Sequence, residues 1–492
     1  MPENTGPSDR KEAGRARREL SRRTFLQGTG AATAMMLAGQ VAQASSAGPP
    51  AQSCATRASR LNVLLDAQGR QILPTGYEVI TDSIDVRRMA RMGANFQMIR
   101  LLAGRLGGWR GVRRDPAYLD VLHDLVMRAE DVGIQTLFVL TLYDIKGYEQ
   151  AAWDQLWENK HGEQEHLLAA WRQLWQRFAH EPAVYGYDLL NEPSRHSGSG
   201  YEESQNRDLV PVLRRFIDAL QQVSKDKWAL YQPMSKDYED VVFNGVKWYV
   251  DMTVPIERDH VIFAPHLYVI EPDRIAAELD SFERQAALSN APMLLGEWGP
   301  AVYLADDFDV SRQFADAHLY QLTGNEIDAR CLGAIKTNYS GSQYEHRAKI
   351  TYTWALFSDY SATGRVERKY IVDPIVRPRP QVIAGRIESF GMDFATREFE
   401  LLVSTQPALG ASVLFIPVDR HYPDGYRLQI GEGLRMQYRP EEGRLMLTQA
   451  NGDVDRTQAE QIRWDPGPQR LYIDRWSTEQ ALTIKVLPGE WS

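Results

Sequence analysis

Apolar runs of strand length alternate with amphipathic stretches over residues 61–375. A run such as 94–103 favours a buried strand, and the stretch at 116–133 repeats apolar residues every three to four positions, as a helix does. This alternation predicts βα units and a parallel sheet. Counted along the chain, the strand-length runs are 70–80, 94–103, 134–143, 183–193, 227–234, 260–270, 291–300 and 349–359.

Eight such units predict a (β/α)8 TIM barrel over residues 61–375. The eighth position has a competitor, because residues 329–341 contain another apolar run. After residue 375 the pattern changes to short alternating runs that follow an extended Arg-Pro-Arg-Pro connection at 377–380. Closely spaced short strands predict a β-sandwich over residues 376–492. The predicted fold class is therefore α/β, a TIM barrel with an appended all-β sandwich.

The N-terminal segment has the pattern of an export signal. Arg22 and Arg23 precede a mildly apolar stretch at 28–41, and Ala42 and Ala44 provide a small-residue cleavage site. Paired arginines in this position resemble a twin-arginine signal. We therefore predict a signal peptide at 1–44, a linker at 45–60 and a secreted or periplasmic product. No later apolar run is long enough for a membrane helix, so we expect no stable membrane insertion.

The composition and net charge limit the classes of molecule that the protein can be expected to bind. The 492 residues are 43% apolar and 25% charged, as in a soluble globular protein, and the net charge of -9 disfavours nucleic acid as a partner. The two cysteines, Cys54 and Cys331, could pair if oxidised, but two in this length do not form a disulfide scaffold. We expect each to be a lone thiol. The oligomeric state stays open.

Polar residues stand where the predicted strands end, which in a barrel is where the active site forms. The fourth run ends in Asn191 and Glu192, and the seventh ends in Glu297. The sixth run ends with His266 and Tyr268, which the strand period of two places on the same side. A buried carboxylate is costly unless it is paired or used. We therefore expect these five residues to meet around one mouth.

Two carboxylates among aromatic residues suit glycoside hydrolysis, in which one carboxyl protonates the leaving oxygen and the other attacks the anomeric carbon or activates water. We expect Arg100 and Tyr268 to donate hydrogen bonds to an ionised Glu297. Asn191 could bind the sugar 2-hydroxyl. Trp354, in the predicted eighth strand, could offer a flat apolar face to the ring.

Other chemistries have little support in the sequence. There is no His-Glu-x-x-His motif, no cysteine pair at ligand spacing and no Gly-x-Ser-x-Gly elbow. No glycine-rich phosphate loop follows a strand. We therefore expect neither a metal nor a cofactor.

Three motifs, in this order along the predicted barrel, resemble the strand-end motifs of glycoside hydrolase family 5. They are NEP at 191–193, HLY at 266–268 and GEWG at 296–299. The resemblance implies that Glu192 is the acid/base and Glu297 the nucleophile. It also implies retention of the anomeric configuration, with the two carboxyl groups about 5–5.5 Å apart.

Further segments are similar to the endoglycoceramidase-related branch of that family: 64–79, 376–393 and the RHYPDGY stretch at 420–426. That branch carries a C-terminal β-sandwich and cleaves between the intact glycan and the ceramide of glycosphingolipids. One residue departs from the family pattern. Tyr143 stands where the family usually has a histidine that lines the sugar site, which leaves the sugar preference open.

The sequence thus predicts a hydrolase acting on a carbohydrate or glycolipid, with glycosphingolipid-like substrates first. An endo-β-glucanase, mannanase or other β-glycosidase is the alternative within the family. A non-catalytic sugar- or lipid-binding barrel is the alternative of another class. The retained pair of glutamates argues against a binder, which has no use for it.

Overall fold

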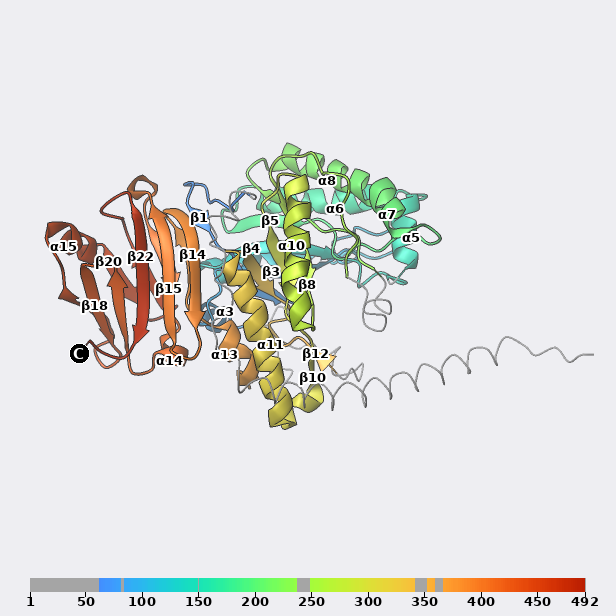
Figure 1. Ribbon diagram of the computed structural model, residues 1–492. Coiled ribbons are helices and arrows are strands. Elements are labelled where there is room, and N and C mark those ends of the chain that lie inside the picture. The colour runs from blue at the N-terminus through green and yellow to red at the C-terminus, as the bar shows by residue number, and fades with distance from the viewer. Residues whose placement is uncertain are drawn as a thin grey trace, which may run out of the picture. The chain divides into compact units, whose positions relative to one another are not determined.

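A parallel sheet forms the centre of the larger, N-terminal part of the chain (Figure 1). The computed structural model describes residues 62–80, 84–148, 150–236, 248–340, 352–358 and 366–491. The order of strands in the sheet is β7-β6-β5-β4-β3-β2-β11-β9-β8. Their bounds are β2 Thr75–Val79, β3 Phe96–Leu102, β4 Gln135–Thr141, β5 Val184–Asp188, β6 Trp228–Tyr231, β7 Val261–Phe263, β8 His266–Leu267, β9 Leu294–Trp298 and β11 Gly333–Lys336.

The first and last strands of that order belong to one run of the chain. Only Ala264 and Pro265 separate β7 from β8, and a proline has no N–H with which to continue a ladder. β7 pairs with β6 and β8 pairs with β9, both in parallel. The run therefore joins the two edges of the sheet, and the nine strands amount to eight barrel positions. The predicted TIM-like barrel is confirmed.

Helices occupy the connections between these strands. Their apolar faces follow the predicted spacing: on α6, Trp171 and Trp175 are fully buried, and Trp171 packs edge-on against Tyr187 of β5 with ring centroids 5.8 Å apart. The helices are α3 Val86–Arg91, α4 Tyr118–Glu130, α5 Ala151–Glu158, α6 Glu163–Phe178, α7 Tyr201–Ser204, α8 Val210–Val223, α10 Pro272–Leu288, α11 Val310–Ala329 and α13 Lys369–Ile375, with a π turn η1 at Gln205–Leu209 and a 3-10 turn η2 at Leu304–Phe308. No helix among the described residues has the length and apolar character needed to cross a bilayer.

The predicted position of the eighth strand is wrong. The barrel strand is β11, within the competing run at 329–341, and it pairs in parallel with β2 and β9. Tyr352–Thr353 instead form β12, which pairs antiparallel with β10 (Val302–Tyr303) outside the barrel sheet. Lys336 explains the error, since a lysine at the end of a four-residue strand weakens its apolar signal. Its buried ammonium donates to the carbonyl oxygens of Thr337 and Trp354 at 2.7 and 2.8 Å.

The first predicted strand, 70–80, is two strands. Leu73 and Pro74 interrupt it, so that only β2 enters the barrel. β1 (Gln71–Ile72) pairs antiparallel with β13 in the C-terminal part of the chain. The predicted boundary between residues 375 and 376 stays a prediction, and β1 shows that strand pairing crosses it.

Two antiparallel sheets make up the C-terminal part, as predicted for a sandwich (Figure 1). Their strand orders are β1-β13-β16-β21-β20 and β14-β15-β22-β17-β18-β19. Side chains of both sheets, such as Leu414 and Leu401, share one buried apolar cluster. The bounds are β13 Arg379–Ile383, β14 Gly385–Asp393, β15 Glu398–Thr405, β16 Ser412–Phe415, β17 Tyr426–Ile430, β18 Leu434–Arg439, β19 Arg444–Gln449, β20 Ile462–Asp465, β21 Arg470–Ile473 and β22 Ala481–Pro488, with short helices η3 Pro407–Leu409, α14 Val418–His421 and α15 Asp453–Glu460.

The sandwich contacts the end of the barrel at which the strands begin. Arg470 donates to the carbonyl oxygens of Ala94 and Val132, just before β3 and β4, at 2.9 and 3.2 Å. Gln381 donates to the carbonyl oxygen of Gly93 at 2.9 Å. The end at which the strands finish is therefore on the other side of the barrel from these contacts.

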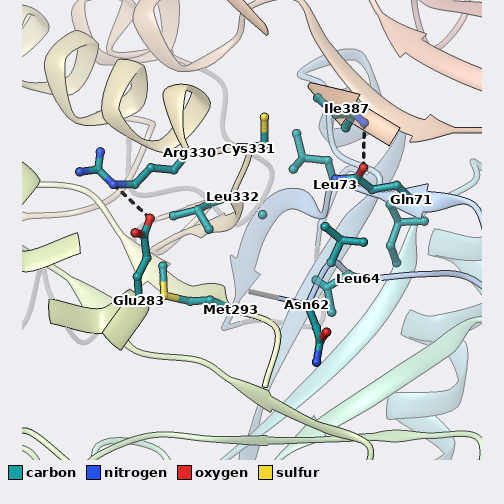
Figure 2. Close-up of a pocket in the computed structure, with 13 residues that line it drawn as sticks. Asn62, Leu64, Gln71, Leu73, Glu283, Met293, Arg330, Cys331, Leu332 and Ile387 are labelled. Carbon is teal, nitrogen blue, oxygen red and sulfur yellow. Dashed lines mark hydrogen bonds and ion pairs between the residues drawn. The ribbon is translucent and has the colours of Figure 1, made fainter. Parts of the chain in front are cut away.

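The expectation of two lone thiols is wrong for Cys331, which is disulfide-bonded. The chain has one other cysteine, Cys54, which lies outside the described residues. Figure 2 shows Cys331 beside Arg330 and Leu332 in a cavity of about 50 Å³ at the base of the barrel. A cavity of that volume is too small to hold a sugar ring, so it is no candidate for the substrate site.

A buried ion cluster ties α11 to the connection that leads into the sandwich. Asp328 forms ion pairs with Arg377, whose Nε lies 2.8 Å from Asp328 Oδ2, and with Arg379, and all three side chains are at most 5% exposed. We expect Asp328→Ala to lower the free energy of unfolding by about 3–5 kcal/mol, because it leaves two guanidinium groups buried without their counter-ion. Denaturant unfolding measures this change.

The matched control is Asp474→Ala, which removes the exposed partner of Arg463. Exposed pairs of this kind contribute about 0–1 kcal/mol, so this variant should unfold close to the wild type. Equal effects of the two substitutions would contradict the structural role given to the buried cluster.

Candidate active site

At the mouth of the barrel, the backbone of Glu192, which follows β5, has an unusual conformation. Its φ is 45°, in the left-handed region that a non-glycine residue enters at a cost. Neighbours that follow β6 hold it there: its N–H donates to Gln232 Oε1 at 2.9 Å, and Ser235 donates to its carbonyl oxygen at 3.0 Å. This conformation fixes the direction in which the carboxyl group leaves the strand.

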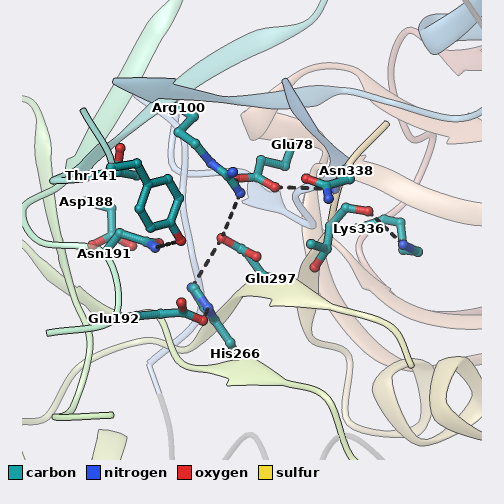
Figure 3. Close-up of polar contacts among 12 residues, drawn as sticks. Glu78, Arg100, Thr141, Asp188, Asn191, Glu192, His266, Glu297, Lys336 and Asn338 are labelled. Carbon is teal, nitrogen blue, oxygen red and sulfur yellow. Dashed lines mark hydrogen bonds and ion pairs between the residues drawn. The ribbon is translucent and has the colours of Figure 1, made fainter. Parts of the chain in front are cut away.

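His266, on β8, lies between the two predicted catalytic glutamates (Figure 3). Its Nδ1 is 2.9 Å from Glu192 Oε1, and its Nε2 is 3.9 Å from Glu297 Oε1. The ring is fully buried. Burial by itself lowers the pKa of His266, but the carboxylates of Glu297 and Glu192 outweigh it and raise the pKa to about 9. While both carboxyl groups are ionised, the imidazole therefore favours its cationic form, and each of its nitrogens faces one of the two glutamates.

Glu297, on β9, has donors on its other sides. The Tyr268 hydroxyl donates to its Oε2, and Arg100 Nη2 lies 4.0 Å from its Oε1. The side chain of Glu297 is 4% exposed, whereas that of Glu192 is 21% exposed. Burial and the charge of Glu297 raise the pKa of Tyr268 well above its usual value, so the phenol keeps its proton and remains a donor. This arrangement holds the Glu297 carboxyl group in one orientation.

Glu78 is a site residue that the sequence reasoning missed. It is fully buried on β2, where it accepts from Arg100 Nε at 2.7 Å and from the Asn338 N–H at 3.3 Å. Burial raises the pKa of Glu78 to about 7, against the opposing effect of Arg100. The available signal was a carboxylate within the apolar run 70–80. Its position aims the Arg100 guanidinium at Glu297.

Asn191 and Tyr143 meet on the adjacent side of the mouth. Asn191 Nδ2 donates to the Tyr143 hydroxyl at 3.3 Å, and the Arg100 guanidinium lies 5.1 Å from the centre of the Tyr143 ring. Tyr143 is 41% exposed, whereas Asn191 is 4% exposed. The residue that departs from the family pattern thus presents a partly exposed aromatic ring beside the asparagine predicted to bind the sugar.

A row of aromatic rings borders the same mouth. Tyr268 lies between Trp354 and Trp248, with ring centroids 5.6 and 5.8 Å away. Trp354 belongs to the segment after β12 and not to a barrel strand, so its predicted origin in the eighth strand is wrong. Trp248 was not among the predicted site residues, because it lies between the predicted strand runs 227–234 and 260–270 and not at the end of one.

A second buried carboxyl lies below Glu192 and was also missed. Asp188, the last residue of β5, is fully buried and accepts from Gln232 Nε2 at 2.8 Å. Burial raises the pKa of Asp188 to about 7. The Tyr249 hydroxyl donates to Gln232 Oε1 at 3.1 Å, so Gln232 links Asp188, Tyr249 and the backbone of Glu192. This network positions the Glu192 backbone from beneath.

Contacts connect all eight predicted site residues into one group around the strand ends. These residues are Arg100, Tyr143, Asn191, Glu192, His266, Tyr268, Glu297 and Trp354. Within the part of the chain that the structure describes, no three His, Cys, Asp or Glu side chains gather where they could hold a metal ion. The chemistry that the group itself can perform is proton transfer and nucleophilic attack by a pair of carboxyl groups.

The charge on His266 predicts a pH-dependent stability. Because its pKa is raised from 6.5 to about 9 on folding, the stabilisation is fully present below pH 6.5 and is lost as the pH rises through 9. We expect His266→Asn to destabilise the protein more at pH 6.5 than at pH 9.5, as measured by melting temperature. His180→Asn, which alters an exposed histidine, should show no such difference. An equal loss at both pH values for His266→Asn would contradict the assigned charge.

Comparisons with known families agree with this architecture. Residues 66–324, more than half of the chain, match the cellulase (glycosyl hydrolase family 5) model, and residues 377–486 match the glycoside hydrolase family 5 C-terminal domain. Residues 19–39 match the twin-arginine translocation signal, which confirms the predicted export to the periplasm or beyond.

Two curated relatives are endoglycoceramidases. Endoglycoceramidase I of Rhodococcus hoagii (strain 103S) is 26% identical over 304 residues, which are 59% of this chain and 56% of the relative. An endoglycoceramidase of Hydra vulgaris is 23% identical over 313 residues, 61% of this chain and 55% of the relative. The chain thus spans little more than half the length of these relatives.

Among solved structures, endo-glycoceramidase II from Rhodococcus sp. superposes with a TM-score of 0.64 at 18% identity. The match covers 87% of this chain and 100% of that chain. At this identity the likeness establishes a shared fold, in which a barrel and a C-terminal β domain occur together.

Proposed function

The chain belongs to glycoside hydrolase family 5, and on that premise we propose that it is a retaining β-glycosidase that cleaves the bond between a glycan and a lipid. The observation that carries the proposal is the group formed by Glu192, His266 and Glu297, in which one buried imidazole lies between two carboxyl groups at the strand ends. A binding protein would gain nothing from this arrangement, because each carboxylate costs desolvation.

In the first step we assign Glu297 as the nucleophile. Its carboxylate attacks the anomeric carbon, and the bond from that carbon to the lipid oxygen breaks. Glu192 transfers its proton to the departing oxygen, so that the lipid leaves as an alcohol. Tyr268 and Arg100 orient the attacking carboxylate through the contacts already described, which supports this division of roles.

In the second step water takes the place of the lipid. Glu192, now a carboxylate, removes a proton from the water, and the oxygen attacks the anomeric carbon as the bond to Glu297 breaks. The glycan leaves with its original configuration and both glutamates return to their starting states. The greater exposure of Glu192 supports its assignment to the step that needs water. We assign Asn191 to binding the sugar and Tyr143 and Trp354 to the border of the sugar site; their contacts at the mouth support this assignment.

The lipid part of the proposal rests on the relatives. Both curated relatives carry the name endoglycoceramidase, and one solved structure of the Rhodococcus sp. enzyme is titled as a complex with ganglioside GM3. A glycolipid substrate therefore agrees better with the comparisons than a β-glucan or β-mannan does.

The test is a product analysis of the mature protein with a multi-sugar glycosphingolipid in detergent. We expect intact glycan and ceramide as the products, measured by mass spectrometry. The matched control is the same protein carrying Glu297→Gln. Cleavage of β-glucan, β-mannan or a simple aryl glycoside without release of ceramide would overturn the lipid assignment and leave the two-glutamate mechanism in place.

A further inference from the structure

Large apolar side chains that face solvent are concentrated at one end of the barrel. Among the described residues, the exposed ones are Leu65, Tyr143, Ile270, Leu288, Phe308, Val310, Phe314, Val366, Leu447 and Val454. Six of the ten lie in segments that follow the carboxyl ends of barrel strands: Tyr143, Ile270, Phe308, Val310, Phe314 and Val366. Single exposed apolar residues need no explanation, but a gathering at one face marks an interaction surface.

The densest part of this gathering is the segment from η2 into α11. Phe308 is 91% exposed, Val310 80% and Phe314 62%. Val310 and Phe314 are four residues apart on α11, so they lie on one face of its first turns. We call these three residues the apolar patch. Side chains with so much exposed surface gain free energy from any partner that removes them from water.

The apolar patch lies at the catalytic end of the barrel. β9, which carries Glu297, ends at Trp298, and the chain then passes through β10 and η2 into α11. β10 pairs with β12, and Trp354, which follows β12, packs on the Tyr268 ring beside Glu297. The start of α11 therefore follows the end of the strand that carries Glu297, on the catalytic side of the barrel.

Three acidic residues next to the apolar patch are already engaged within the protein. Asp306 binds Arg312 at 3.1 Å, and Asp307 binds Arg368 at 2.9 Å. Asp309 caps α11 by accepting from the backbone N–H of Ser311 at 3.0 Å. These carboxylates therefore present little unpaired charge, and the whole chain carries a net charge of -9. Such a surface suits an uncharged or zwitterionic partner and not an anionic one.

We propose that the catalytic end of the barrel docks onto a zwitterionic lipid–water interface, with Phe308, Val310 and Phe314 entering the apolar layer. The inference rests on the proposed function, because an enzyme that cleaves a glycan from a lipid meets its substrate at such a surface. Docking through the apolar patch brings the mouth against the interface, where the bond between sugar and lipid lies. Burial of exposed aromatic side chains drives this kind of peripheral attachment.

The experiment measures binding separately from catalysis. Mature protein carrying Glu297→Gln is sedimented with phosphatidylcholine vesicles, with and without the pair Phe308→Ser and Phe314→Ser. We expect the pair to lower the bound fraction about tenfold or more, because it removes two aromatic side chains from the interface. The matched control pair, Leu447→Ser and Val454→Ser, removes exposed apolar residues of the sandwich and should bind like its parent. Both pairs replace exposed side chains, and equal melting temperatures verify their folding.

A second readout uses the proteins with Glu297 intact. The Phe308 and Phe314 substitutions should lower hydrolysis of a glycolipid held in vesicles about tenfold and leave hydrolysis of a soluble aryl glycoside unchanged. If the parent protein does not bind vesicles, or if the pair of substitutions leaves binding intact, the docking proposal is wrong. If the parent binds through the apolar patch and yet cleaves no glycolipid in vesicles or in detergent, docking is supported and the proposed function is what fails.

Discussion

Replacing Glu297 by Gln should lower kcat by about 10⁴-fold or more for every substrate, because an amide does not form the glycosyl-enzyme that a retaining mechanism requires. Gln keeps the size of the side chain and can still accept from Tyr268 and face Arg100, so the fold and substrate binding should persist. Steady-state kinetics measures the loss, and calorimetric titration with a substrate measures the retained binding.

The control for this substitution is Glu130→Gln, which makes the same chemical change at an exposed position at the end of α4. Its kcat should equal that of the wild type. A Glu297→Gln protein that keeps more than about a hundredth of the wild-type kcat would contradict the assignment, since general acid–base catalysis alone contributes about 10²–10⁴-fold.

Glu192→Gln should produce a loss that depends on the leaving group. With a lipid alcohol, which leaves slowly without a proton, kcat/KM should fall about 10²–10⁴-fold. With a dinitrophenyl glycoside, whose leaving group needs no proton, kcat/KM should stay close to the wild-type value. The second step still lacks its base, so the glycosyl-enzyme should accumulate and a burst of phenolate should precede slow turnover.

The decisive comparison for Glu192 is between those two substrates in the same variant. Azide, which attacks without needing a base, should restore turnover of the activated substrate. Asp188→Asn is the matched control, because it alters a buried carboxyl beneath Glu192 that makes no contact with the proposed reacting atoms. It should affect both substrates alike. An equal loss on both substrates for Glu192→Gln would remove Glu192 from the role of acid.

Much of the barrel and of the site could be predicted because each depends on local sequence. The strand runs are apolar on both faces, as a buried parallel sheet requires, and the polar residues that end them stand out by contrast. Asn191, Glu192 and Glu297 are detectable for that reason. The parallel sheet then brings them together without any further information, because all of its strands end on one side.

The features that the sequence analysis missed depend on contacts between different parts of the chain. β11 is four residues long and ends in Lys336, whose buried ammonium donates hydrogen bonds to the carbonyl oxygens of the adjacent Thr337 and of the distant Trp354. Glu78 and Asp188 are stabilised by Arg100 and Gln232, which come from neighbouring strands. Trp354 reaches the site from an antiparallel ribbon outside the barrel. Each depends on contacts between distant segments, which the local pattern does not contain.

Tyr143 illustrates the same difference between what the local sequence predicts and what only tertiary contacts show. Its sequence position marks a departure from the family pattern, but only the structure shows what the substitution does. The phenol accepts from Asn191 and lies beside Arg100, so it joins the network that surrounds Glu297. A change at this position therefore alters the sugar side of the mouth without altering the two glutamates.

The most direct test of the account traps the covalent intermediate. The mature protein is incubated with an activated 2-deoxy-2-fluoro β-glycoside, which slows both steps and lets the glycosyl-enzyme accumulate, and the digested protein is then analysed by mass spectrometry. We predict one added fluoroglycosyl group, located on Glu297, and none in Glu297→Gln. Inactivation with the sugar attached to another residue, or turnover of a natural substrate with an inverted product, would contradict the central claim that Glu297 is the nucleophile of a retaining glycosidase.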